Sequence, residues 1–293
     1  MPDRLLRGVL PEHNFRFAIC QTAELASQAI HQQGCDWMGG WLLGEALTCG
    51  ALLSVNLKGQ ERITLRWDYE GPVGQILVEL GEDGEVRGYT QKKRLVGHAE
   101  DLDTALGDNG TISASSSFPK KLGRTGVTHT VFQNLAKDLG HFLSLSFQTE
   151  TALALGLIMP PEEPPILQSA TGVLVQPLPG ADLERFEILR KELESESFST
   201  WMESTPRELE EILAHFSNGE EAQILSEVVP RFECKCSREK VQSMLQLLDS
   251  AELHEMMEED QGAQVDCHFC SKKYHFSRTD LESLLERSQP GHG

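Results

Sequence analysis

The hydrophobic pattern at the start of the chain predicts a domain in which strands and helices are mixed. Residues 15–20 begin with alternating apolar and polar side chains and are rich in aromatic and branched residues, so the first strand is expected there. A helix over residues 22–33 should follow, with Thr22 as its N-cap. A second, strongly apolar helix is expected over residues 36–55, capped by Asp36.

Short strand-like runs then replace the helical pattern. Turn sequences such as Asp83-Gly84 separate the first of them, which indicates an antiparallel meander. A helical spacing of Leu135, Leu139 and Phe142 predicts a helix that covers one face of the sheet. The fold class expected for residues 1–180 is therefore α+β, with a mixed or antiparallel sheet and packed helices. Its later strands are predicted at residues 63–67, 75–80, 86–89, 110–118, 127–132, 151–158 and 172–176.

Residues 181–230 have a different pattern, with apolar side chains at helical spacing and thirteen acidic against four basic residues. We interpret this segment as a linker of amphipathic helices. It is either a spacer that stays folded or, because short acidic helices depend on packing, a segment that melts when its docking surface is lost. Its two apolar stripes are Leu183, Phe186, Leu189 and Leu193, and Leu209, Ile212, Leu213 and Phe216.

Residues 231–293 are expected to form a small separate module. Helices are predicted to start near Ser237 and at caps Ser250 and Ser277, and a hairpin should carry the second pair of cysteines described below. With so few bulky apolar groups, about sixty residues need a staple such as a structural metal. The module should therefore unfold without its ion.

The composition narrows the possible partners and location. A formal net charge of −19 opposes binding to nucleic acid or to an anionic membrane. The apolar stretch 37–57 is better explained as a buried core helix than as a membrane span, because it carries Glu45 and several glycines. The start of the chain shows no secretory signal pattern, so we expect a cytosolic protein.

Two close pairs of cysteines, Cys234-Lys-Cys236 and Cys267-His-Phe-Cys270, have the spacing of a tetrahedral all-sulfur metal site. One Zn²⁺ ion is the first candidate, and His268 or His275 could replace one sulfur. Four thiolates leave a net charge of about −2 on such a site. The basic residues nearby are either its local compensation or ordinary solvated side chains: Lys235, Arg238, Lys240, Lys272 and Lys273.

The tight Cys234-x-Cys236 spacing also suggests redox chemistry, because structural zinc knuckles generally use wider spacing on both sides. A disulfide between positions i and i+2 closes a strained ring, and strained disulfides are labile. Thiolates near lysines are also the form that peroxide attacks. Oxidation would expel the metal and remove the folding energy of the module, so the site has the chemistry of a switch as well as a staple.

These residues carry a resemblance to a known family. The segment 232–240, FECKCSREK, followed by Cys267-His-Phe-Cys270 and residues 274–276, closely resembles the signature of the HslO family, the bacterial redox-regulated heat-shock chaperones of thirty-three kilodaltons. Residues 172–181 resemble the family's strand before its linker, and the three-part layout (1–180, 181–230, 231–293) matches over nearly the whole chain.

The resemblance implies a holdase that needs no ATP, is not an enzyme, and is inactive while reduced and zinc-bound. It further implies that oxidation forms the disulfides Cys234–Cys236 and Cys267–Cys270, releases zinc, unfolds the linker and yields a dimer that binds unfolded client proteins. Clients would bind either the linker stripes or the core sheet that they cover.

Other functions have less support from the residues. A thiol oxidoreductase built on Cys267-x-x-Cys270 would not need a Cys-x-Cys pair upstream, and a zinc-dependent nucleic-acid-binding regulator conflicts with the acidity of the chain. Cys20, Cys35 and Cys49 are expected to be small hydrophobic residues in or beside the core, with a role as secondary oxidation targets left open.

Overall fold

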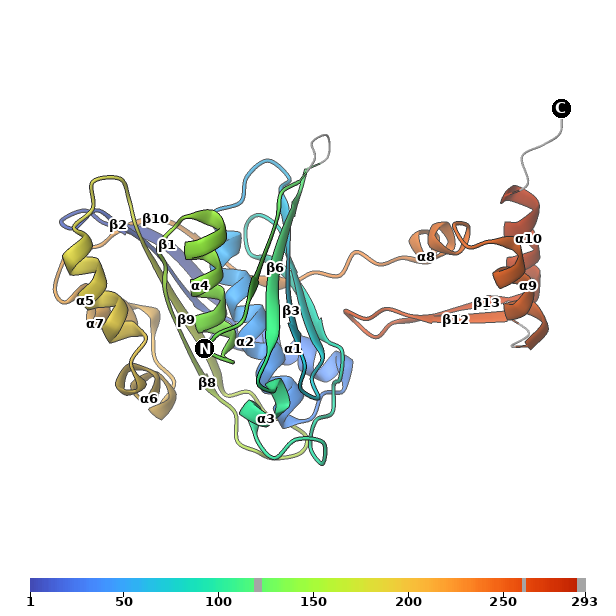
Figure 1. Cartoon of the computed structure of the whole chain (residues 1–293), viewed down its shortest axis with the longest axis horizontal. Helices are drawn as coiled ribbons and strands as arrows, with labels where there is room; N and C mark the ends of the chain where they lie inside the picture. Colours follow the sequence, from blue (N-terminus) through green and yellow to red (C-terminus); the bar gives the residue numbers. More distant parts are fainter. Residues whose placement is uncertain (119–122, 260–261, 289–293) are drawn as a thin grey trace. The chain divides into compact units, whose positions relative to one another are not determined.

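The computed structural model describes residues 1–118, 123–259 and 262–288. The chain divides into two compact units, residues 1–233 and residues 234–293. The first unit contains two sheets with helices between and beside them, and the second contains a hairpin and three helices (Figure 1). The α+β class expected from the sequence is confirmed. The predicted boundary at residue 180, between the core domain and the linker that would detach from it, lies inside this first unit and stays a prediction.

One sheet of the first unit has five antiparallel strands. Both of its faces are covered, which explains why all but the last residue of its strand Ser169–Pro177 are buried instead of alternating with exposed positions. In spatial order its strands are β10 (Gln223–Val228), β1 (Arg4–Leu10), β2 (Phe15–Gln21), β9 (Ser169–Pro177) and β8 (Ala152–Ile158).

The second sheet has six strands and is mixed, because β11 pairs with β5 in the parallel direction while its other neighbours are antiparallel. The predicted meander is confirmed at its centre. In spatial order the strands are β11 (Arg231–Phe232), β5 (Glu85–Thr90), β4 (Gln75–Leu80), β3 (Arg62–Tyr69), β6 (Gly110–Ser117) and β7 (Thr125–His129).

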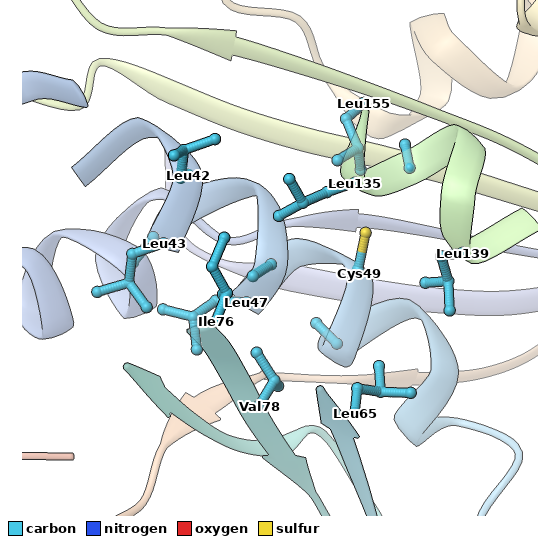
Figure 2. Close-up of a cluster of buried hydrophobic side chains, with 14 of the residues drawn as sticks. Leu42, Leu43, Leu47, Cys49, Leu65, Ile76, Val78, Leu135, Leu139 and Leu155 are labelled. Carbon is cyan, nitrogen blue, oxygen red and sulfur yellow. The ribbon is translucent and has the colours of Figure 1, made fainter. Parts of the chain in front are cut away.

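Helices α1 (Ala23–Gln33), α2 (Trp37–Ser54) and α4 (Leu135–Phe147) share the main hydrophobic core with residues of both sheets. Figure 2 shows leucines of α2 facing side chains of β3, β4, β8 and α4. Nearly every residue of α2 is buried, and no described helix meets the length and apolarity needed to cross a membrane. The α2 stretch is therefore a core helix, as predicted.

Two glycines of α2 have a steric role. A Cβ atom at Gly39 would lie 2.2 Å from the carbonyl oxygen of Lys93, and one at Gly50 would lie 2.7 Å from a methyl group of Val78. Asp36 caps the helix as predicted, since its carboxylate accepts the N–H of Gly39 at 2.9 Å. The glycines let the helix lie against both the neighbouring loop and the six-stranded sheet.

Several predictions for the first unit are wrong in detail. Strand β1 was not expected, although it pairs along its whole length with β2. Thr22 is the N-cap residue of α1 as predicted, but its side chain makes no capping bond: its hydroxyl bonds to the Thr48 hydroxyl, while the carboxylate of Asp3, just before β1, accepts the N–H groups of Glu24 and Leu25. A cap supplied from so far along the chain leaves no local sequence signal.

Three further elements depart from the predictions. The strand expected at residues 127–132 lies at 125–129 as β7, and the short helix α3 (Leu102–Leu106) was not expected. Between residues 181 and 230 the sequence indicated helices alone, but the segment also contains β10, which pairs with β1. Pairing with a distant strand supplies the backbone hydrogen bonds that an exposed, acidic strand cannot provide locally.

Three helices of this segment cover the outer face of the five-stranded sheet (Figure 1). They are α5 (Leu183–Leu193), α6 (Glu196–Ser204) and α7 (Leu209–Ser217). The predicted stripes face the sheet, except that Leu183 at the start of α5 is exposed and Leu213 is only partly buried. Phe186 packs edge-to-face on Phe15 and Phe216 on Phe17, with ring centroids 5.6 and 5.7 Å apart.

The second unit has a small core of its own between a hairpin and three helices. Its elements are α8 (Arg238–Leu245), α9 (Ser250–Glu259), β12 (Gly262–Asp266), β13 (Lys273–Ser277) and α10 (Arg278–Ser288). The hairpin and the caps Ser237 and Ser277 are confirmed. The cap of α9 is Asp249 and not Ser250, because the Asp249 carboxylate accepts the N–H of Glu252 at 2.8 Å.

Glu45, the one charged residue of α2, makes the first unit sensitive to pH. Burial raises the pKa of its carboxyl to about 7, against a hydrogen bond from Trp41, and the carboxylate of Glu203 on α6 adds to the rise. A folded-state pKa above the unfolded value penalises the ionised form, so this contribution to stability is present at low pH and is lost as pH rises through about 7. The linker helix α6 is thereby electrostatically coupled to the core.

Glu45→Gln is expected to raise the free energy of unfolding by about 1 to 3 kcal/mol at pH 8 and to leave it nearly unchanged at pH 4.5. Urea unfolding at the two pH values measures the difference. Glu100→Gln, at an exposed position, is the matched control. A gain at pH 8 no larger than that of the control would contradict the assignment.

Candidate metal centre

The four predicted ligands come from two places in the second unit. Cys234 and Cys236 lie in the extended segment before α8, where Ser237 begins the helix by accepting the N–H of Lys240 at 3.3 Å. Cys267 and Cys270 lie in the loop that joins β12 to β13. A helix start and a hairpin loop thus each provide one close pair of thiols.

The hairpin loop is a tight knuckle. The N–H of Cys267 donates to the carbonyl of Lys272 at 3.0 Å, and the N–H of Ser271 donates to the carbonyl of Cys267 at 2.8 Å. Ser271 adopts a left-handed backbone with φ of 56°, which lets the chain turn back into β13. These bonds place Cys267 and Cys270 at opposite ends of one turn.

All four sulfur atoms lie within 4.8 Å of one another. The Sγ atoms of Cys234 and Cys267 are 3.6 Å apart, and those of Cys236 and Cys270 are 3.4 Å apart. A tetrahedral ion with metal–sulfur bonds of about 2.3 Å requires sulfur separations of about 3.8 Å. The cluster therefore has the size of a four-sulfur metal site, and all four cysteines are free thiols.

Tyr274 belongs to the site as well, although the sequence indicated it only as part of the family signature. Its hydroxyl lies 3.1 Å from the sulfur of Cys236 and donates to it. At Cys236 burial acts to raise the thiol pKa, but this bond and the neighbouring thiols outweigh it and lower the pKa to about 7. At Cys234 and Cys270 burial instead raises the pKa. The sequence signal that could have placed Tyr274 inside the module is the alternation along β13, which puts Tyr274 on the same buried face as Phe276.

Four of the predicted basic residues make contacts with groups other than the cysteine sulfurs. Arg238 pairs with Asp280 at 3.0 Å and lies over the ring of Phe276, and Lys273 is 3.7 Å from Asp266. The ammonium of Lys240 donates to the carbonyl of Lys235, and that of Lys272 lies 5.4 Å from the ring centroid of Tyr274. Arg238 and Lys273 are therefore paired with carboxylates, so compensation of the cluster by these two cations stays a prediction.

The histidine alternatives find no support in the geometry. Among the described residues of this unit, the potential ligand atoms that come together are the four sulfurs, without His268 or His275. Cys20, Cys35 and Cys49 are buried in the main core, as expected. Burial raises the pKa of all three thiols, that of Cys35 to about 12, so they are far less ionised than Cys236 at neutral pH.

Comparison with known proteins identifies relatives along nearly the whole chain. The family model described as "Hsp33 protein" matches residues 3–277. A "33 kDa chaperonin" from Desulforamulus reducens is 30% identical over 98% of this chain and 98% of its own length. Another from Trichodesmium erythraeum is 31% identical over 99% of this chain and 95% of its own.

A solved structure has the same fold. The crystal structure of the 33 kDa chaperonin (heat shock protein 33 homolog) from Thermotoga maritima superposes with a TM-score of 0.87. The match covers 98% of this chain and 99% of the other, at 23% sequence identity. The fold of this chain is therefore shared with a known structure.

Proposed function

The chain belongs to the Hsp33 family, and from this premise we propose that it is a chaperone whose activity is switched by oxidation of its four clustered cysteines. Relatives along its whole length are named chaperonins, which supports the chaperone assignment. In this proposal the protein is a cytosolic holdase that binds unfolded client proteins without ATP and has no enzymatic role. The cysteine cluster is the observation that supports the redox part of the proposal.

In the reduced state, we assign one Zn²⁺ ion to Cys234, Cys236, Cys267 and Cys270. Their sulfur separations fit a tetrahedral tetrathiolate, and sulfur ligands favour zinc among common metals. When bound, zinc would hold the four sulfurs as thiolates and tie the helix start to the hairpin. The hydroxyl of Tyr274 would lower the charge density on the sulfur of Cys236.

Oxidation would convert this cluster to two disulfides, Cys234–Cys236 and Cys267–Cys270. Forming each disulfide removes two electrons from two thiolates. Two molecules of hydrogen peroxide accept the four electrons and, with four protons from solvent, become four molecules of water, so no thiolate ligand remains for the zinc ion. The pairing follows the family resemblance. The sulfurs of Cys234 and Cys267 and those of Cys236 and Cys270 are also close, at 3.6 and 3.4 Å, so a crossed pairing is the alternative. A mass map of the disulfides decides between the two pairings.

Release of the linker would expose apolar surface for clients. Helices α5 to α7 attach to the sheet through buried aromatic and aliphatic side chains, and both faces of that contact would become accessible together. Either the linker stripes or the outer face of the sheet would bind an unfolded client, and two active molecules would form a dimer. The high negative charge of the chain opposes binding to nucleic acid and to an anionic membrane, so neither is a proposed partner.

The test treats the reduced, zinc-loaded protein with peroxide at elevated temperature. We expect zinc to be released while about four thiols and part of the helicity are lost. Suppression of the aggregation of an unfolding client should increase at the same time. Zinc release without a gain in antiaggregation activity would contradict the proposed switch. Mass spectrometry and light scattering provide the measurements.

Cys234→Ser with Cys236→Ser provides the matched variant. It should weaken zinc binding and uncouple activity from the oxidant, since two of the four thiolates are gone. Lys235→Ala, which lies between the two cysteines and removes no thiol, is the control and should respond like the unchanged protein. Unchanged zinc affinity in the double variant would remove these residues from the site.

A further inference from the structure

Both ends of the linker helices meet the same turn of the core. In the turn between β1 and β2, the carbonyl of His13 accepts the N–H of Asp182, the N-cap of α5, at 3.2 Å. The N–H of Glu12 donates to the carboxylate of Glu220, just after α7, at 2.6 Å. Residues 182–220 therefore form a closed loop whose two ends are held at one place.

Side chains with metal-binding atoms gather at this turn. A carboxylate oxygen of Glu12, a ring nitrogen of His13 and a carboxylate oxygen of Glu220 lie within 4.8 Å of one another. The other oxygen of Glu220, Oε2, is shielded from solvent and has no hydrogen-bond partner among the described residues. A shielded carboxylate oxygen without a donor is costly, and a cation is a partner that would satisfy it.

The surroundings favour a cation too. The carboxylate of Asp182 lies 3.9 Å from Nδ1 of His13, so three carboxylates surround one imidazole. A carboxylate that lies beside a metal-binding imidazole commonly orients the ring. One histidine with carboxylates suits divalent ions such as Zn²⁺.

We propose that Glu12, His13 and Glu220 form a second metal site, where a divalent ion clasps the end of the linker helices beyond α7 to the β1–β2 turn. Glu220 lies between α7 and β10, so the three residues come together while α7 and β10 are docked on the core. An ion that binds only the docked form multiplies the equilibrium constant for docking by 1 + [L]/Kd, where [L] is the concentration of the free ion. The bound ion should therefore also raise the threshold for activation of the chaperone. This consequence rests on the proposed function, whereas the binding of the ion does not.

The binding test uses the reduced protein with its four-cysteine site already filled with zinc. Calorimetric titration with further Zn²⁺ is expected to show one additional equivalent. His13→Ala and Glu220→Gln should each weaken it at least about tenfold, since even loss of an outer partner of a metal ligand has that effect. Glu220→Gln preserves the acceptor for the Glu12 N–H, so it tests the charge without removing the backbone contact.

Glu221→Gln is the matched control, because it makes the same charge change at the exposed neighbouring position. Its titration should equal that of the unchanged protein. The site is refuted if the additional equivalent is missing, or if it survives in His13→Ala and Glu220→Gln as it does in this control. These measurements involve neither oxidant nor client, so a failure here is distinct from a failure of the redox proposal.

Hydrogen exchange tests the clasp. With excess Zn²⁺ at about 100 times Kd, amides of residues 183–217 should exchange up to about 100-fold more slowly in the unchanged protein and in Glu221→Gln. Glu220→Gln should show no such slowing. Binding of the second ion without any slowing in this segment would overturn the clasp.

Discussion

Chelation of the metal from the reduced protein is expected to unfold residues 234–293 while most of residues 1–233 stays folded. Among its described residues the second unit has a core of nine buried side chains, too few to stabilise it alone. Structural zinc sites in small peptides contribute about 10 to 16 kcal/mol, far more than such a core supplies. Hydrogen exchange followed by mass spectrometry should show loss of protection across α8, β12, β13 and α10.

The return of zinc should restore that protection, because the thiols are unchanged by chelation. His13→Ala, which retains all four cysteines, should behave like the unchanged protein in this second unit. Protection of the hairpin that persists in the metal-free protein would mean that the cysteines are not a folding staple. The first unit serves as an internal reference, since its large core contains residues of both sheets and of helices α1 to α4.

Phe186→Ala is expected to release the linker helices without any oxidant. Phe186 is 1% exposed and packs on Phe15 of the five-stranded sheet, so its truncation should cost about 3 to 5 kcal/mol. That loss falls on the contact between α5 and the sheet. The reduced, zinc-loaded variant should therefore suppress client aggregation, and amides of residues 183–217 should exchange faster.

Ile188→Ala provides the control in the same helix. Ile188 is 55% exposed, so its truncation should change neither exchange nor activity appreciably. If Phe186→Ala loosens the linker but remains inactive while reduced, linker release is insufficient for activity and the switch requires a further step. If the variant is active with its linker still protected, clients bind elsewhere.

The sequence alone predicted the elements whose signals are local. Asp36 caps α2 because an aspartate directly precedes the helix, and the meander follows from turn residues such as Asp83-Gly84. The cysteine spacing predicted the two close pairs, since each pair lies in one short segment, and the pairs meet as expected for one metal site. Patterns within about ten residues carry this information, and for that reason these predictions are confirmed.

The missed features depend on partners far along the chain. Asp3 caps α1 from a distance of some twenty residues, and β10 becomes a strand by pairing with β1 across more than two hundred. The hydroxyl of Tyr274 reaches the sulfur of Cys236 only when the hairpin folds against the segment before α8. No local pattern marks such contacts, because they are formed only when the chain folds.

By itself, the sequence determined the helical periodicity of the linker, the apolar core helix and the two pairs of cysteines, since each is written in neighbouring residues. The tertiary structure alone decided that the linker stripes lie on the five-stranded sheet and that Glu12, His13 and Glu220 meet at one turn. Which surfaces of short, marginal helices are buried depends on long-range packing, because the free energy of folding is a sum over the whole unit.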